Sequence, residues 1–471
     1  MNLRHKDLYI PKEKTEDPFA NCKLERKPYA QILTQIVSNY ADGFVLAINN
    51  PWGEGKSTFV KMWQQQLCNE GYTTLYYNAW ENDFEKDVLV ALISELAEIK
   101  NKPVNTFNKV IDKVVPLTSK LLPLIAKHMA KRTIGDEATN SIIEGVVEYG
   151  AQELKDEIKS YTSKKKSIQD FKDTLEVFVN EVGKEKPVIF IIDELDRCRP
   201  NYAVEVLEQI KHLFSVPGIV FVLSIDKIQL GHAVKGVYGN DNIDSNEYLR
   251  RFIDIEYSIP VPNKRLLCNY FYEYFEFSVF FKTTYRERRN NNDSYNFIEL
   301  SHKLFSKTNL RIRQIEKIFA HARLALKSFG NKETVFPKLF LLLIFLKNHH
   351  SNIYNNIKVK KYTLQELIDT FENLLPNKIT DDEYSNPILY TIVELAVFYH
   401  NYYQKENHPK LNVLKKDNEL KETLAFNSKF DKSENQQILI GHYYNLKRKY
   451  ILENLNIHSL IKKIDLLEPI S

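Results

Sequence analysis

Short apolar runs alternate with segments of helical periodicity over the first 262 residues of the chain. Most of the apolar runs show no polar alternation, and polar residues, proline or glycine bound them. This pattern is typical of strands that are buried on both faces of a parallel sheet. Between the runs, apolar residues recur every three or four positions, and strands alternating with such helices predict an α/β core whose parallel sheet carries helices on both faces. The predicted strands are 44–48, 72–78, 188–192, 219–225 and 253–259.

Two parts of the chain depart from this alternation. Residues 100–166 are charged, contain helical stretches over 110–127 and 141–158, and end in three lysines, so we interpret them as a helical insertion. After residue 262 the periodicity is helical, and only Gly330 and Gly441 follow Gly239. Because tight hairpin turns favour glycine, this scarcity predicts an all-α C-terminal region. The predicted domains are a P-loop NTPase core formed by 1–99 and 167–262, the insertion 100–166, a helical lid 263–335 and a helical partner-binding region 336–471.

The composition is that of an ordinary globular protein, with 43% hydrophobic and 27% charged residues among 471 and a net charge of +4. The four cysteines lie far apart with no C-x-x-C pair, which argues against a zinc site and favours a reducing compartment. The longest apolar run, 339–346, is far shorter than the ~20 residues of a membrane-spanning helix. Residues 1–14 lack the apolar stretch of a signal peptide. We therefore expect a cytoplasmic protein without a membrane span.

A glycine-containing loop lies between the first predicted strand and the helix that begins at Lys56. Gly55, Lys56 and Ser57 match the end of the phosphate-loop pattern G-x-x-x-x-G-K-[ST], while Asn50 stands in place of the first glycine. Asparagine adopts a positive φ more readily than other side chains, so we expect it to be tolerated there. Because strand, loop and helix follow in the required order, we favour nucleotide binding over a turn that binds nothing. The predicted nucleotide-binding residues of the loop are Asn50, Pro51, Trp52, Gly53, Glu54, Gly55, Lys56, Ser57 and Thr58.

Each residue type in this loop suits a bound nucleoside triphosphate. Glycines let backbone N–H groups surround an anion without a Cβ clash, and the start of the following helix adds partial positive charge. Lys56 is predicted to reach the β- and γ-phosphates. The Ser57 hydroxyl is predicted to ligate Mg²⁺.

Two carboxylates end the third predicted strand. Asp193 is predicted to help to hold Mg²⁺, and its neighbour Glu194 to orient or deprotonate the attacking water. An Asp-Glu pair can also simply end a strand, but the upstream loop favours the functional interpretation, with Lys56, Asp193 and Glu194 as the catalytic set. Arg197 leaves three alternatives open: a phosphate contact, a bridge to a neighbouring subunit, or an ion pair with Asp196, which we favour slightly.

Together these residues resemble the KAP family of P-loop NTPases over roughly residues 15–330. The family more often has Asp at the position of Glu194, and its insertion often carries membrane helices, whereas the insertion here is charged. The resemblance implies ATP as the nucleotide, ATP hydrolysis, a core related to AAA+ and STAND ATPases, and a soluble member of bacterial defence against phage. It also suggests partner proteins encoded beside the chain, such as a nuclease. The motifs that carry the resemblance are Asp17-Pro18-Phe19, Pro51–Ser57, Tyr77–Trp80, Ile192–Cys198, Phe221–Asp226 and Glu247–Phe252.

Further polar residues are candidates of lower rank. Asp226 follows the fourth predicted strand and is predicted either to face the γ-phosphate, as a nucleotide-binding residue, or to cap the strand end. In the predicted lid, Arg313 resembles an arginine that reports the γ-phosphate from a helix, and Arg311 competes for that role. Trp80 is interpreted as a core aromatic rather than as a base-stacking one.

Other basic residues bear on partners. Arg250 and Arg251 are interpreted as members of surface ion pairs. The alternative is that they act as arginine fingers, which reach into the active site of a neighbouring subunit in a homo-oligomer. Three basic clusters, 164–166, 286–289 and 358–361, leave contact with nucleic acid or acidic lipid open, although charge runs are usually solvated surface.

The favoured function is a Mg²⁺-dependent ATPase that acts as a switch, in which hydrolysis reorients the helical region. A nucleotide-gated scaffold with little hydrolysis is one alternative, and Asn50 mildly favours it. An ATP-driven nucleic-acid motor or loader is another, and it predicts stimulation by DNA or RNA. A small-molecule kinase is disfavoured because the two carboxylates suit attack by water.

Overall fold

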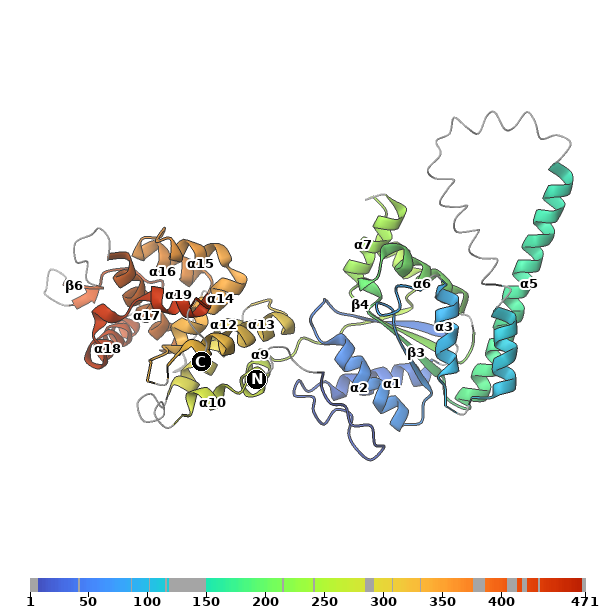
Figure 1. Ribbon diagram of the computed structural model, residues 1–471, viewed down its shortest axis with the longest axis horizontal. Coiled ribbons are helices and arrows are strands. Elements are labelled where there is room, and N and C mark those ends of the chain that lie inside the picture. The colour runs from blue at the N-terminus through green and yellow to red at the C-terminus, as the bar shows by residue number, and fades with distance from the viewer. Residues whose placement is uncertain are drawn as a thin grey trace. The chain divides into compact units, whose positions relative to one another are not determined.

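The computed structural model of the chain (Figure 1) divides into two compact units. Leu8–Val261 form the first, here termed the core unit, and Pro262 begins the second, the C-terminal unit. Each is described by itself. The structure describes residues 7–40, 43–85, 87–100, 102–114, 117, 150–213, 216–239, 242–283, 292–306, 308–330, 332–375, 386–404, 413–416, 422–430 and 433–467.

A sheet of five parallel strands in the order β2-β3-β4-β1-β5 forms the centre of the core unit. The register aligns Asp193 of β3 with Asn78 of β2 and with Ser224 of β4, so the carboxyl ends of these strands meet at one edge. The parallel sheet predicted from the sequence is confirmed. The strands are β1 Phe44–Asn49, β2 Thr74–Asn78, β3 Val188–Asp193, β4 Ile219–Ile225 and β5 Ile255–Tyr257.

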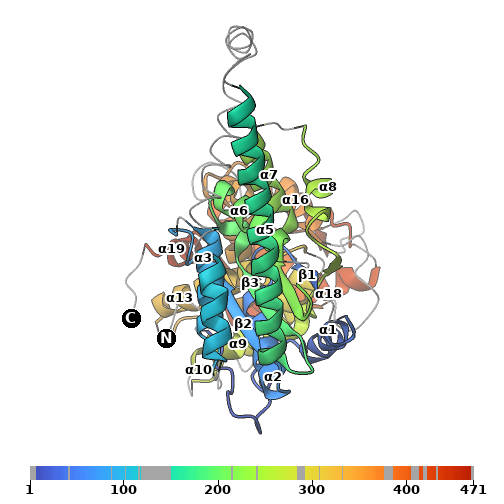
Figure 2. The ribbon, with the colours of Figure 1, turned by 90° about the vertical axis from the view of Figure 1, so that its right-hand side faces the viewer.

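Helices cover both faces of this sheet, as predicted (Figures 1 and 2). Leu46 and Ile48 of β1 are buried with α1 Lys27–Asn39 and α2 Lys56–Asn69 on one face. Val45, the alternate residue of the same strand, is buried with the helices of the other face. Burial on both faces explains why the strands are near-continuous apolar runs. The helices that contribute to this second face are α3 Val88–Ala97, α5 Gly150–Gly183, α6 Pro200–Leu213, α7 Lys227–Tyr238 and α8 Ser245–Arg250, and a 3₁₀ helix spans Leu195–Arg197.

The predicted insertion lies only partly within the described residues, because 118–149 fall outside them. α5 runs without a break across the predicted boundary at residue 166. Phe171 and Phe178 of this helix are buried in the same hydrophobic cluster as Phe190 of β3. The second half of α5 is thus held by the sheet, and the division of the core at residues 100–166 stays a prediction.

The C-terminal unit is helical, as predicted, and several of its helices pack against α14 Pro337–His349. Residues 337–346 of this helix are all buried, which explains the longest apolar run of the sequence. A short antiparallel pair, β6 Leu414–Lys416 and β7 Glu422–Leu424, departs from the all-α prediction. Among the residues that the structure describes, no helix is long and apolar enough to cross a membrane. The separation of a lid, 263–335, from a partner-binding region stays a prediction.

The other helices that the structure describes in the C-terminal unit surround or extend this group. They are α9 Lys264–Tyr274, α10 Phe277–Phe281, α12 Asp293–Ser306, α13 Ile312–Ala325, α15 Ser351–Lys358, α16 Leu364–Asn373, α17 Asn386–Gln404, α18 Ser433–Lys449 and α19 Ile457–Ile464, with short 3₁₀ helices at Leu326–Ser328 and Leu452–Asn454.

Candidate nucleotide-binding site

The loop between β1 and α2 has a backbone that suits the phosphate-loop pattern. Gly53 and Gly55 have φ values of +85° and +73°, a conformation that residues with a Cβ rarely adopt. Gly55 directly precedes α2, whose first N–H groups have no partner within the helix and carry partial positive charge. Strand, loop and helix therefore form a frame that suits a bound anion.

Asn50 differs from our expectation. Its φ is not positive, so the reason we gave for asparagine at this position was wrong. Its side chain is buried instead and forms two hydrogen bonds with the backbone of Ile259. Asn50 Nδ2 donates to Ile259 O at 2.8 Å, and Ile259 N–H donates to Asn50 Oδ1 at 2.9 Å. Asparagine thus serves a tertiary contact here, not a left-handed backbone.

Two buried cations lie against the loop. Lys56 Nζ donates to the carbonyl of Asn50 and lies 3.5 Å from that of Pro51. Burial lowers the pKa of Lys56, although nearby aspartates oppose that shift. Arg26 Nη1 donates to Gly55 O at 3.2 Å, and burial lowers the pKa of this guanidinium as well. Sequence reasoning missed Arg26, because no local pattern relates it to a loop 29 residues further along the chain.

The acidic end of β3 lies beside the start of α2. Ser57 Oγ donates to Glu194 Oε1 at 3.3 Å. Asp193 is almost fully buried, and its carboxylate accepts from the Tyr76 hydroxyl at 2.8 Å and from the Glu194 N–H at 2.9 Å. Glu194 has a φ of +61°, a strained conformation for a residue with a side chain and one that clusters at functional sites. Tyr76 was also missed, and the pairing of β2 with β3 brings it there.

Arg197 pairs with Glu194, so the ion pair with Asp196 that we favoured was wrong. Arg197 Nη1 lies 3.0 Å from Glu194 Oε1, and its guanidinium lies 5.7 Å from the ring centroid of Trp80. The core interpretation of Trp80 was wrong too, since 53% of this residue is exposed. Asp196 instead accepts a hydrogen bond from the indole N–H of Trp52. Burial raises the pKa of Glu194, and Arg197 opposes that rise.

Asp226 holds the phosphate loop from the β4 side. One carboxylate oxygen caps α7 by accepting from the N–H groups of Ile228 at 3.2 Å and Gln229 at 3.3 Å. The other oxygen accepts from the N–H of Trp52 at 3.1 Å. Asp226 therefore ties the loop to α7, and its contact with a γ-phosphate stays a prediction.

The other arginine candidates belong to two different parts of the chain. Arg311 is the N-cap of α13 and Arg313 lies in its first turn, and both are exposed in the C-terminal unit. A sensor role for either stays a prediction. Arg250 forms an exposed ion pair with Glu247, with 3.2 Å between Nη1 and Oε2, as the surface interpretation expects. A role of Arg250 or Arg251 in a homo-oligomer stays a prediction.

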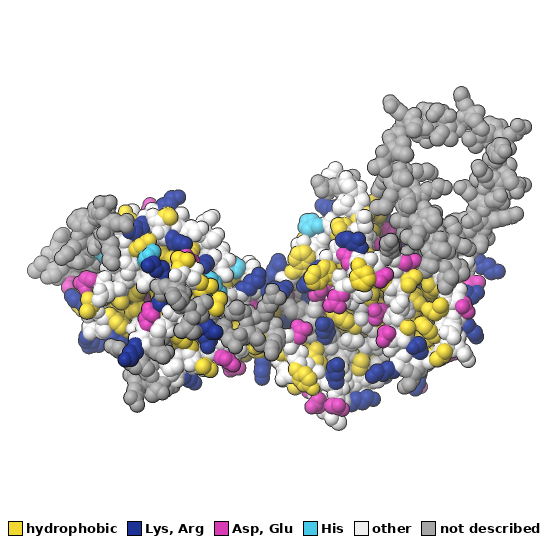
Figure 3. Space-filling view, in the orientation of Figure 1, with side chains coloured by type: hydrophobic (Ala, Val, Ile, Leu, Met, Phe, Trp, Pro, Cys, Tyr) yellow, Lys and Arg dark blue, Asp and Glu magenta, His cyan; other side chains and the backbone are white. Residues whose placement is uncertain are grey.

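The basic clusters considered for contact with nucleic acid differ in what the structure shows of them. Lys358 pairs with Asp465 at 2.6 Å, and Lys360 Nζ lies 4.5 Å from the ring centroid of Tyr402. The cluster at 286–289 lies outside the described residues. On the face of the core unit in Figure 3, acidic and basic side chains are interspersed. Contact with nucleic acid stays a prediction.

The oxygen donors of the site fit Mg²⁺. This ion prefers oxygen ligands, and proteins usually hold it with one or two side chains while phosphate oxygens and water complete its shell. A hydroxyl and carboxylates meet here, because Ser57 Oγ lies 3.3 Å from Glu194 Oε1 and Glu194 follows Asp193 directly. Ser57 and Asp193 are the residues that would hold the metal.

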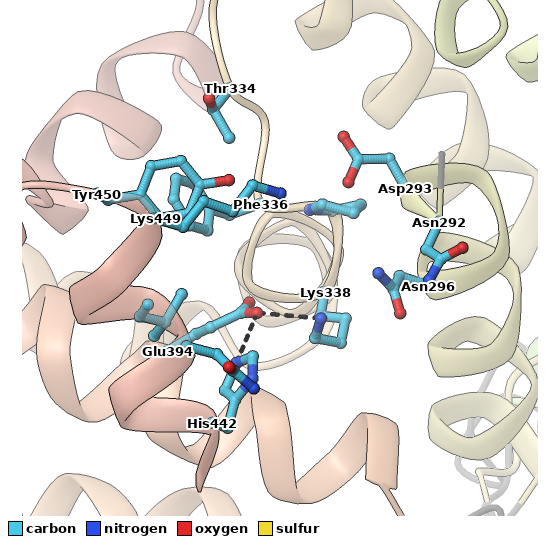
Figure 4. A pocket seen from close by; sticks show the side chains of 13 residues that line it. Asn292, Asp293, Asn296, Thr334, Phe336, Lys338, Glu394, His442, Lys449 and Tyr450 are labelled. Carbon is cyan, nitrogen blue, oxygen red and sulfur yellow. Dashed lines mark hydrogen bonds and ion pairs between the residues drawn. The ribbon is translucent and has the colours of Figure 1, made fainter. Parts of the chain in front are cut away.

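A polar cavity of about 330 Å³ lies within the C-terminal unit (Figure 4). Glu394 in its lining forms an ion pair with Lys338 at 3.0 Å and lies 3.3 Å from His442 Nε2. Burial opposes the charge of Glu394, but Lys338 and His442 hold the pKa of its carboxyl below the usual value. The three side chains come from α14, α17 and α18, so we interpret them as a buried charge cluster that joins these helices.

Replacing Lys338 by methionine is expected to destabilise the C-terminal unit by about 3 kcal/mol, because a buried carboxylate loses its cation. Thermal unfolding of the full chain, with hydrogen exchange followed in α14 and α17, measures the loss. Lys347→Met on the same helix is the control, since Lys347 is more exposed than Lys338 and Asp465 keeps its pair with Lys358 at 2.6 Å, so we expect a loss below about 1 kcal/mol. Lys338→Met combined with Glu394→Leu should recover most of the stability, and no recovery would assign the effect to packing.

Comparisons with known proteins bear mainly on the core unit. A model of the KAP family P-loop domain matches residues 26–324. The phage T7 exclusion protein of Escherichia coli (strain K12) is 22% identical over 249 residues, which cover 48% of this chain and 31% of that protein. The chain thus spans less than a third of that relative.

Two solved structures are similar over most of their length but only distantly. The ORC2 protein of Aeropyrum pernix, solved as ADPNP-ADP complexes, is 13% identical with a TM-score of 0.31, and 94% of this chain and 93% of that chain are covered. A DNA replication initiation factor is 11% identical with a TM-score of 0.30, and 94% and 95% are covered.

Proposed function

Because the chain belongs to the KAP family of P-loop proteins, we propose that it binds ATP with Mg²⁺ and hydrolyses ATP as a nucleotide-driven switch. The observation that carries this proposal is the 3.3 Å contact between Ser57 and Glu194. It joins the hydroxyl that the loop motif assigns to the metal with the carboxylate that we assign to the attacking water. Phosphate release by the purified full chain, compared with that of Glu194→Gln, tests the proposal.

Some residues around the loop bind the phosphates or Mg²⁺, and others position the side chains that do so. Loop N–H groups and Lys56 bind the phosphates. Ser57 and Asp193 hold Mg²⁺, which when bound neutralises charge on the phosphate oxygens. The hydroxyl of Tyr76 fixes the orientation of the Asp193 carboxylate, because it donates to it at 2.8 Å.

Glu194 is proposed as the general base. Burial raises the pKa of its carboxyl, which makes the carboxylate a stronger base than an exposed one. Arg197, at 3.0 Å, opposes that rise in pKa and so favours the ionised form of the carboxylate. The two influences together suit a group that must be charged before the reaction and must accept a proton during it.

Replacing Arg197 by alanine is expected to move the acid limb of the pH profile of ATP turnover to higher pH. A general base acts when deprotonated, so turnover is present above the pKa of Glu194 and is lost as the pH falls through it. Arg197 lowers this pKa, so its removal raises the pH at which turnover is lost. Initial rates over a pH series measure the shift.

The control for this change is Arg199→Ala, because Arg199 pairs with Asp83 at 2.8 Å and not with Glu194. Its acid limb should stay where that of the wild type lies. If Arg197→Ala leaves the limb in place as well, Glu194 is not the group that titrates in turnover.

We further propose that the ATPase acts in bacterial defence against phage, together with proteins encoded beside it, such as a nuclease. The similarity to the phage T7 exclusion protein supports this. Plaque counts on cells that carry the chain with its neighbouring genes test the proposal. Protection is expected to disappear with Lys56→Met, and equal protection by the variant would separate defence from nucleotide binding.

Turnover measured with and without nucleic acid distinguishes the other mechanisms. ATP binding without phosphate release would replace the ATPase by a nucleotide-gated scaffold. Strong stimulation by DNA or RNA, with binding that weakens steeply as salt is raised, would identify a nucleic-acid motor or loader. The proposed switch predicts neither result.

A further inference from the structure

Asn50 touches three separate parts of the core unit. Its backbone N–H donates to Ile225 O at 3.1 Å, which continues the β1–β4 ladder by one residue. Its carbonyl accepts from the ammonium of Lys56. Its side chain, only 7% exposed, binds both backbone groups of Ile259. One residue therefore links the end of β4, the lysine of the phosphate loop and the chain that follows β5.

The contact with Ile259 requires an amide side chain. Nδ2 donates to the Ile259 carbonyl while Oδ1 accepts from its N–H, so the side chain reproduces the pair of hydrogen bonds of a neighbouring strand residue. Glycine, the residue of the loop motif at this position, has neither group. Aspartate would retain the acceptor but would place a carboxylate against the carbonyl of Ile259.

The segment that Asn50 holds is a weakly paired edge of the sheet. β5 lies at the end of the strand order and pairs with β1 over 255–257. Asn49 Nδ2 adds a bond to Glu256 Oε1 at 2.7 Å, and Lys227 Nζ binds the other oxygen at 2.7 Å. Segments with few ladder bonds open at lower free energy than the centre of a sheet, so side-chain contacts weigh heavily here.

Ile259 lies two residues before Val261, the last residue of the core unit. Residues 259–263, here termed the connector, lead from it to the start of α9 at Lys264. Pro260 and Pro262 each have a fixed φ, which reduces the number of conformations that the connector can adopt. Ile259 therefore begins a short segment in which two of the five residues have a fixed φ.

We propose that Asn50 transmits nucleotide binding from the phosphate loop to the connector, the segment that leads into the C-terminal unit. The inference rests on the proposed function, because it requires a nucleotide in the loop. Phosphates that attract the Lys56 ammonium compete with the Asn50 carbonyl that this ammonium now binds. Asn50 then loses its hydrogen bond with Lys56 but keeps its two hydrogen bonds with Ile259. A shift of the loop therefore acts on Ile259 through these two bonds.

Hydrogen exchange of the full chain, with and without Mg²⁺ and a slowly hydrolysed ATP analogue, tests this coupling. In the wild type, we expect the exchange of the Ile259 amide and its neighbours in the connector to change by about tenfold when the nucleotide binds. In Asn50→Gly this response is expected to be lost. Calorimetric titration gives the affinity of each variant, so that all are compared at saturation.

Asn49→Ala is the matched control, because Asn49 binds Glu256 and not Ile259; it should speed exchange in β5 equally with and without nucleotide, and should keep the nucleotide response of the connector. Asn50→Asp is the second variant, which retains the acceptor for the Ile259 N–H, and its response should be reduced. If Asn50→Gly does not fold, Asn50→Asp decides the test by the same comparison.

Two results overturn the coupling while nucleotide binding stands: a wild-type connector that does not respond to bound nucleotide, or Asn50 variants that respond as the wild type does. A calorimetric titration in which the wild type binds no nucleotide is a different failure. It removes the proposed function, and the coupling falls with it.

Discussion

Replacing Glu194 by glutamine is expected to lower ATP turnover by a factor of about 10³ while ATP still binds. Glutamine has the size of glutamate and can still accept the hydrogen bond of Ser57, so the loop and the metal ligand should keep their places. The amide cannot take a proton from the attacking water, so the step that we propose for this partly buried carboxylate should be lost. Steady-state phosphate release measures the loss, and calorimetric titration measures binding separately.

Glu205→Gln is the matched control for this change. Glu205 lies on α6 of the same unit, and burial raises the pKa of its carboxyl as it does for Glu194. It is not part of the Ser57 contact, so its turnover should stay within about twofold of the wild type. A loss below tenfold in Glu194→Gln would show that another group activates the water.

Replacing Lys56 by methionine is expected to weaken ATP binding by about 100-fold and to abolish turnover. The ammonium is held at the loop by the Asn50 carbonyl, where the motif requires a cation for the phosphates. Charge-assisted hydrogen bonds to phosphate account for a loss of this size. Methionine keeps the apolar stem of this buried side chain, so the change removes charge with little effect on packing.

Lys61→Met is the control for Lys56→Met, since Lys61 is an exposed cation on the same helix and lies 5.5 Å from the ring centroid of Tyr76. Its ATP affinity should match that of the wild type within about threefold. Equal affinity of Lys56→Met and the wild type would contradict phosphate binding by the loop. Thermal unfolding of both variants guards against a loss that reflects misfolding.

The strands of the core could be predicted because burial on both faces of a sheet leaves a local pattern. Every residue of β3 and β4 is buried, so the apolar run and the strand coincide. The extent of a helix is harder to predict, since α5 runs without a break across residue 166 and Phe171 and Phe178 pack against the sheet, while the domain division at 100–166 stays a prediction. β6 and β7 leave no such pattern, because each has three residues and their pairing alone defines them.

The candidate site was predictable where its residues follow one another or end adjacent strands. Lys56 and Ser57 belong to one contiguous motif, and Asp193 ends a recognisable strand. The partners of these residues were not predictable. Arg197 contacts Glu194 because a 3₁₀ turn places the two residues three apart on one side, and this turn has no apolar period that would reveal it.

The sequence by itself determined the order of strands and helices in the core, the phosphate loop and the acidic strand end, because these depend on local periodicity and on contiguous motifs. Only the tertiary structure decided what Asn50 does in that loop. Its partner Ile259 lies 209 residues away, and no local rule relates an amide to a backbone group at such a distance. Backbone preference suggested a positive φ, whereas the fold placed a hydrogen-bonding edge within reach of the side chain, and that contact is the physical reason for asparagine.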